Sequence, residues 1–250
     1  MQQIVLLLLF RGDQIKVSDP MAQSPWLEMV ASFATPIHHT KQIHPTEHRL
    51  VTDTPTMVWK THSPSQLVPW KGGLDALKSK VIVVVRNPND AAVSLYHHTM
   101  DANTNWKFSG DLHDFLHLFL DGNVESGSYW EWYSNWWAAK VANPDTILWV
   151  KFEDLKTNLR GQVERISDFL GCQLSQSELD LVSQASTFEA MKAQQKTIDA
   201  KKEVEGKRIK KNHIRRGKVG TWREVFAESH VAAFDELNGE YKASEWTALV

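Results

Sequence analysis

The run VIVVV, from Val81 to Val85, constrains the fold more than any other part of the chain. Five consecutive apolar, β-branched residues are typical of a strand that is buried on both faces of a parallel sheet. The sequence RNP follows at once, and its proline, Pro88, ends the strand. The residues from Asp90 onward have helical composition. This part of the chain therefore predicts a strand, a tight turn and a helix.

Further strand and helix patterns alternate along the chain. Residues 56–59 and 146–150 are strand candidates, and helical patterns cover residues 111–120, 128–142, 158–170 and 175–185. This alternation predicts an α/β fold with a mainly parallel central sheet flanked by helices. No linker rich in Pro, Gly or Ser divides the chain, so we expect one domain over residues 1–250.

Composition excludes several classes of protein. With 250 residues, 42% hydrophobic and 23% charged, the chain is long enough to bury a core and is not fibrous or disordered. The single cysteine, Cys172, excludes a disulfide framework and multi-cysteine metal sites. The apolar run at residues 4–10 is too short to cross a bilayer and predicts a buried helix. We therefore expect a soluble, cytoplasmic protein with no membrane partner.

Charge is distributed unevenly along the chain. Between Lys192 and Arg223 there are twelve basic residues and three acidic ones, in a chain of net charge −2. This block predicts a focused anion site, although a solvated arm explains its KKEVEGKRIKK part equally well. Arg215, Arg216 and Gly217 would place two guanidinium groups where the backbone can approach a ligand closely. A phosphate clamp and nucleic-acid contact both fit, but the interleaved aromatics of a single-strand binder are missing.

A second candidate anion site follows the strand at residues 81–85. Backbone N–H groups and the dipole at a helix start favour a phosphate, and a guanidinium can bind it bidentately. Arg86 stands in this turn, and Ser94 lies far enough into the helix for its hydroxyl to join Arg86. A surface arginine and a helical serine with no ligand remain the alternative.

The segment TMVWKTHSP places Lys60 and His62 just past another predicted strand, on one face with Thr61 between them. A histidine can accept a proton near neutral pH, and an adjacent ammonium can stabilise developing negative charge. The same tripeptide also fits two exposed loop residues without a catalytic role.

Metal and triphosphate chemistry have little support in the sequence. Four histidines, His38, His39, His44 and His48, lie close together but lack carboxylate or thiolate neighbours and regular helical spacing. We therefore predict no metal site. No GxxxxGK[ST] segment is present, which argues against a nucleoside-triphosphate kinase.

Five segments follow one another along the chain: KTHSP, RNPNDAAVSLYHH, SYWEWYSNWW, FEDLKTNLRGQVERISDFLG and RRGKVGTWREVF. In this order they resemble the cytosolic sulfotransferase family, which transfers a sulfuryl group from 3′-phosphoadenosine 5′-phosphosulfate (PAPS) to a hydroxyl or amine. The resemblance covers essentially the whole chain. It implies a P-loop-nucleotide-hydrolase-like sulfotransferase fold, PAPS as co-substrate, a small-molecule acceptor and no nucleic-acid partner.

The resemblance also assigns roles to individual residues. It implies that Lys60 and His62 are catalytic. The residues implied to bind PAPS are Arg86, Ser94, Phe152, Ser186, Phe188, Arg215, Arg216 and Gly217. Those implied to line the acceptor pocket are Trp26, Phe33, His38, His39 and His98. Phe152 replaces the family's usual tyrosine, and Thr221 replaces the aspartate before the tryptophan of the last segment.

The beginning of the chain departs from the family pattern. The family's first strand and its PKSGTTW-type loop, which cradles the 5′-phosphosulfate and supplies a second catalytic lysine, would lie immediately before Gln2. We therefore expect an N-terminally truncated form of the fold, and a catalytically inactive or fragmentary nucleotide-binding relative remains an alternative. Residues 223–232 match the family's dimer-contact segment poorly, so we expect a monomer or a weak dimer.

Overall fold

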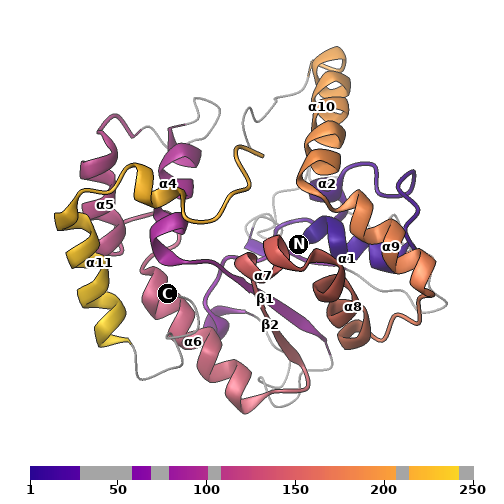
Figure 1. Cartoon of the computed structure of the whole chain (residues 1–250), viewed down its shortest axis with the longest axis horizontal. Helices are drawn as coiled ribbons and strands as arrows, with labels where there is room; N and C mark the ends of the chain where they lie inside the picture. The colour runs from indigo at the N-terminus through magenta and orange to yellow at the C-terminus, as the bar shows by residue number, and fades with distance from the viewer. Residues whose placement is uncertain (29–57, 69–78, 101–107, 207–213, 242–250) are drawn as a thin grey trace, which may run out of the picture. The chain divides into compact units, whose positions relative to one another are not determined.

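The computed structural model describes residues 1–28, 58–68, 79–100, 108–206 and 214–241 (Figure 1). The chain divides into two compact units, each described by itself below. The first unit comprises Met1–Ser63 and Asn158–Ile198, and the second comprises Pro64–Thr157 and Asp199–Val250. The single domain expected from the sequence stays a prediction.

The first unit is helical. It contains α1 (Gln2–Leu9), α2 (Pro20–Gln23), α8 (Leu159–Leu170) and α9 (Gln176–Ala185), and α10 (Phe188–Val204) begins in it. All side chains from Ile4 to Leu9 are buried, and α1 contacts both α8 and α9. This confirms the buried helix predicted from the apolar run. Helix α8 ends at Gly171, whose φ of +77° is the left-handed conformation that glycine adopts easily at a helix end.

The second unit contains a parallel sheet and the helices around it. Strand β1 (Val81–Val85) pairs in parallel with β2 (Ile147–Lys151), in a register that sets Val81 opposite Ile147. Around them lie helices α4 (Pro88–Thr99), α5 (Leu112–Leu120), α6 (Tyr129–Ala142), α7 (Phe152–Thr157) and α11 (Glu228–Glu240), with the short 3₁₀ helices η2 (Ser65–Leu67) and η4 (Thr221–Glu224). The α/β class with a parallel sheet is thus confirmed.

Two details of the strand prediction were wrong. Val83 and Val85 are buried, but Val84 is 36% exposed, so β1 is not buried on both faces in the part of the chain that the structure describes. A β-branched run predicts the strand but does not say what covers each face. Val58 and Trp59 belong to no strand, and the rest of the predicted strand at 56–59 lies outside the described residues.

Aromatic side chains make up much of the core of the second unit. Trp130 and Trp136 of α6 are buried. The rings of Phe119 and Phe234 stack with centroids 5.9 Å apart, which joins α5 to α11. The indole Nε1 of Trp130 donates to the Asn238 Oδ1 over 3.0 Å, so the polar atom of this buried ring is satisfied.

Within the described ranges, no helix has both the length and the apolar character needed to cross a membrane.

Candidate functional site

The turn between β1 and α4 is built from local sequence signals. Asn87 is the N-cap of α4, and its Oδ1 accepts hydrogen bonds from the backbone N–H groups of Asn89 (3.0 Å) and Asp90 (3.3 Å). Pro88 occupies the first helical position, where its fixed φ suits the helix and no N–H is needed. Arg86 is therefore the single residue between the end of β1 and the N-cap of α4.

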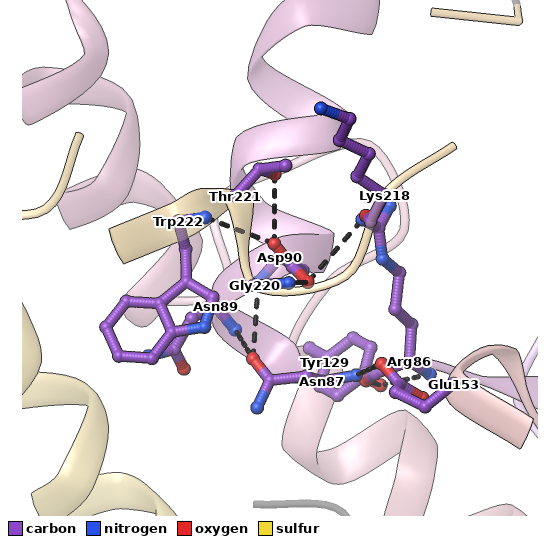
Figure 2. A network of polar contacts seen from close by, with 10 residues as sticks. All are labelled: Arg86, Asn87, Asn89, Asp90, Tyr129, Glu153, Lys218, Gly220, Thr221 and Trp222. Carbon is purple, nitrogen blue, oxygen red and sulfur yellow. Dashed lines mark hydrogen bonds and ion pairs between the residues drawn. The ribbon is translucent and has the colours of Figure 1, made fainter. Parts of the chain in front are cut away.

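Side chains from two other helices fix the backbone of this turn (Figure 2). The Tyr129 hydroxyl donates to the Arg86 carbonyl and accepts from the Arg86 N–H at 3.3 Å. Burial raises the pKa of Tyr129, so its hydroxyl stays protonated. The Glu153 Oε1 accepts from the Asn87 N–H at 2.9 Å. These contacts fix the backbone of Arg86 and Asn87.

The Arg86 guanidinium is held on two sides. Its Nη2 donates to the Lys218 carbonyl at 2.9 Å and lies 3.6 Å from the Asp90 Oδ2. Its Cζ lies 4.6 Å from the centre of the Phe152 ring, so the residue that replaces the family's tyrosine serves as a cation–π platform. The buried Nε of Arg86 has no hydrogen-bond partner among the described residues. It is a donor that an anionic acceptor would satisfy.

The segment that includes Arg215 adds further positive charge near Arg86. Burial, together with the positive charges of Arg216 and Arg86, lowers the pKa of Arg215. Arg216 is exposed and pairs with Glu224 at 2.7 Å. Gly217 has a φ of +59°, which a residue with a side chain rarely adopts. Guanidinium groups that destabilise one another in this way suit a phosphate, which would neutralise them.

Asp90 joins the start of α4 to residues 220–222, and the sequence did not predict this role. Its side chain is fully buried, and it accepts hydrogen bonds from Gly220, Thr221 and Trp222 (Figure 2). An acidic residue in the first turn of a helix ordinarily indicates only a favourable dipole interaction. Nothing local in the sequence points to partners 130 residues away.

Lys60 and His62 both contact one aromatic ring, that of Trp26, in the first unit. Trp26 and Lys60 form a parallel backbone bridge, with Leu27 N–H donating to the Lys60 carbonyl at 2.7 Å. The Lys60 Nζ lies 4.2 Å from the Trp26 ring centre, and the His62 ring meets the same ring edge-on at 4.4 Å. Trp26, predicted as a pocket residue, thus contacts both predicted catalytic side chains.

Glu28 anchors the loop that carries His62, and the sequence analysis missed it as well. Its Oε1 accepts from the Thr61 hydroxyl (2.6 Å), the His62 N–H (2.7 Å), and the N–H and hydroxyl of Ser63 (both 2.9 Å). Burial acts to raise the pKa of Glu28, but these hydrogen bonds outweigh it and lower the pKa to about 2. The carboxylate is therefore ionised at neutral pH.

Glu28→Ala is expected to lower the free energy of unfolding by about 1–3 kcal/mol at pH 7, because it leaves several donors without their acceptor. The pKa of Glu28 falls from 4.5 to about 2 on folding, so its contribution is complete above pH 4.5 and is lost as the pH falls towards 2. Urea denaturation at several pH values measures the free energy of unfolding of the parent, of Glu28→Ala and of Glu28→Gln, which keeps one oxygen acceptor. Equal acid sensitivity of the parent and of Glu28→Gln would contradict the assignment.

The remaining predicted site residues are more scattered. Ser94 is exposed on α4, and His98 is partly buried on the same helix. Ser186 is buried at the end of α9, with no described hydrogen-bond partner for its Oγ, and Phe188 starts α10. Phe33, His38 and His39 lie outside the described residues. No cluster of metal-ligating side chains occurs in the part of the chain that the structure describes.

The structure thus forms two groups of site residues. Trp26, Lys60 and His62 contact one another in the first unit. Arg86 and Phe152 contact each other in the second unit, where Arg215 lies within electrostatic reach.

Sequence comparison shows the family of the chain. Residues 1–247 match the family described as the sulfotransferase domain. Sulfotransferase 2A1 of Mus musculus is 32% identical over 248 residues, which cover 96% of this chain and 79% of the relative. The 3-alpha-hydroxysteroid sulfotransferase of Cavia porcellus is 30% identical, with coverage of 97% and 79%.

Solved structures agree with the sequence comparison. A mouse sulfotransferase, SULT7A1, crystallised in complex with PAP, matches with a TM-score of 0.66 and 28% identity, over 77% of this chain and 68% of that one. A retinol dehydratase matches in fold with a TM-score of 0.69 and 22% identity, over 96% of this chain and 76% of that one. The sulfotransferase fold expected from the resemblance is thereby confirmed. The chain belongs to the sulfotransferase family.

Proposed function

We propose that this protein transfers a sulfuryl group from PAPS to a hydroxyl or amine of a small-molecule acceptor. The observation that carries the proposal is that Lys60 and His62 both contact the Trp26 ring, with the His62 backbone anchored by Glu28. Membership of the sulfotransferase family supports it, as does the PAP complex of the mouse relative.

The residues of the second unit fit the phosphate of the co-substrate. The Arg86 Nε, which has no hydrogen-bond partner among the described residues, and the neighbouring guanidiniums of Arg215 and Arg216 would bind the 3′-phosphate. Ser94 would add a hydroxyl. The positive φ of Gly217 allows the backbone to lie close to the ligand. In the first unit, Ser186 and Phe188 would contact the adenine, where an aromatic ring can stack on the base. When bound, the nucleotide supplies an activated sulfuryl group.

Lys60 and His62 divide the chemistry between them. His62 would accept the proton of the acceptor hydroxyl as that oxygen attacks, and the Lys60 ammonium would stabilise negative charge on the leaving oxygen. Transfer of this kind depends mainly on positioning and charge stabilisation, by analogy with phosphoryl transfer. The contacts of Trp26 with both side chains and of Glu28 with the His62 backbone supply that positioning.

A radiolabelled transfer assay tests the proposal. The protein is incubated with ³⁵S-labelled PAPS and either a phenol or a long-chain alcohol, and labelled product is separated from the donor. We expect label in at least one acceptor. Absence of labelled product from a broad panel of hydroxyl and amine acceptors, with a protein that binds the nucleotide, would contradict the transfer reaction.

Nucleotide binding is expected to raise the pKa of His97, in the last turn of α4. Burial, followed by the positive charges of Arg215 and Arg216, lowers the pKa of this imidazole in the free protein. A bound phosphate would neutralise the two arginines and so remove part of the effect. NMR titration of the His97 ring with and without adenosine 3′,5′-bisphosphate measures this, with 5′-AMP as the control. An unchanged or lowered pKa would show that the phosphate binds elsewhere.

A further inference from the structure

We infer that Asp90 is a positioning residue for nucleotide binding, because it binds residues 220–222 and so holds the segment 218–222 against the first turn of α4. The inference rests on the proposed function, since it concerns the segment that continues from Arg215, Arg216 and Gly217. Asp90 itself would not touch the nucleotide. Its role would be to fix the backbone of residues 218–222, which follow Arg215 and Arg216, so that the two arginines are placed to bind the phosphate.

Both oxygens of the Asp90 carboxylate bind the same short segment (Figure 2). Oδ2 accepts from the Gly220 N–H at 2.6 Å, and Oδ1 accepts from the Thr221 hydroxyl and the Trp222 N–H, each at 3.1 Å. Three consecutive residues therefore donate to one side chain. Such a set of contacts fixes the position and the orientation of the segment together.

The burial of Asp90 makes these contacts obligatory. The side chain is fully buried, and a buried charge is tolerated only when it is paired and hydrogen-bonded. The positive end of the α4 dipole and the Arg86 Nη2, 3.6 Å away, add favourable charge. If residues 218–222 moved away, the carboxylate would lose all three hydrogen bonds. These contacts therefore stabilise the observed position of the segment.

Arg86 holds the same segment at a second point. Its Nη2 donates to the Lys218 carbonyl at 2.9 Å, two residues before the first Asp90 contact. The segment is thus held from both ends of the turn that connects β1 to α4, at Arg86 and at Asp90. This arrangement occupies Nη2 but leaves the buried Nε of Arg86 without a described partner. Arg86 therefore positions the segment through Nη2 and can donate to a phosphate through Nε, which is a different atom of the same guanidinium.

The sequence of the segment suits its contact with Asp90. Gly220 has a φ of +78°, a left-handed conformation that a residue with a side chain rarely adopts. Thr221 is the residue that departs from the family pattern, which has aspartate here. Its hydroxyl donates to Asp90, which an ionised carboxylate at 221 could not do. The substitution is therefore compatible with a buried Asp90.

Asp90→Asn tests the inference by calorimetric titration with adenosine 3′,5′-bisphosphate. The amide places an NH₂ group where an oxygen now accepts an N–H, so the segment should shift and the Kd should rise about 10- to 100-fold. The matched control is Asp114→Asn, which changes the aspartate at the same helical position of α5, far along the chain from these contacts. Its Kd should equal that of the parent. Thr221→Val removes a single donor and should raise the Kd by about 2- to 10-fold.

A purely structural role of Asp90 would give a different result. It would lower thermal stability but leave the Kd of the folded protein unchanged, so circular dichroism must show each variant folded at the titration temperature. In steady-state assays, positioning predicts a raised KM for PAPS with an unchanged KM for the acceptor. A parental Kd in Asp90→Asn would overturn the inference. If Asp90→Asn does not fold, Thr221→Val tests the inference in its place, and a parental Kd of that variant would overturn the inference. Failure of the parent itself to bind the nucleotide would instead refute the proposed function.

Discussion

His62→Ala is expected to lower kcat for sulfate transfer by about 10²–10⁴-fold, the usual contribution of a general base. The variant removes the group proposed to accept the acceptor's proton, while Glu28 continues to anchor the backbone of residues 61–63. The Kd for adenosine 3′,5′-bisphosphate should change little, because the proposed phosphate contacts come from other residues. Initial rates at saturating PAPS and acceptor measure kcat, and calorimetry measures the Kd.

His117→Ala provides the matched control for the loss of an imidazole. His117 is exposed on α5, where its ring contacts His113. Its removal should leave kcat at the parental value. A His62→Ala protein with parental kcat would show that the proton is accepted by another group, and the catalytic assignment would then be wrong.

Arg86→Ala is expected to weaken binding of adenosine 3′,5′-bisphosphate by about 1.5–3 kcal/mol, roughly 10- to 160-fold in Kd, for the loss of a charge-assisted phosphate contact. Arg86→Lys should recover little of this affinity, because an ammonium cannot reproduce the planar fork above Phe152. Calorimetric titration of both variants measures the effect.

Arg165→Ala controls for the loss of one positive charge. Arg165 is exposed on α8 and donates to Gln162 of the same helix. Its replacement should not alter the Kd. Equal affinities of Arg86→Ala and the parent would remove Arg86 from the nucleotide site and would leave its contacts with Lys218 and Asp90 as purely structural ones.

The elements that could be predicted from the sequence are those with local signals. The β-branched run at residues 81–85 forms β1, and Pro88 stands at the start of α4. The apolar run near the N-terminus forms the buried α1, and Gly171 ends α8. In each case the physical cause lies within a few residues of the element that it determines, so one sequence is enough to see it.

The contacts that organise the site could not be predicted in this way. Asp90 binds residues 130–132 positions further along the chain, and Glu28 binds residues 33–35 positions away. Neither spacing has a periodic signature, and both acids have ordinary surroundings in the sequence. The exposure of Val84 was missed for a related reason, because the cover of a strand face is set by distant parts of the chain.

The central claim, that this chain binds a nucleotide through its 3′-phosphate, is tested most directly by comparing two ligands in a calorimetric titration of the parent protein. Adenosine 3′,5′-bisphosphate should bind saturably, and 5′-AMP, which lacks only the 3′-phosphate, should bind at least about 10-fold more weakly. That result would agree with a phosphate site at Arg86, Arg215 and Arg216. Equal affinities for the two nucleotides, or no binding of either, would contradict the account.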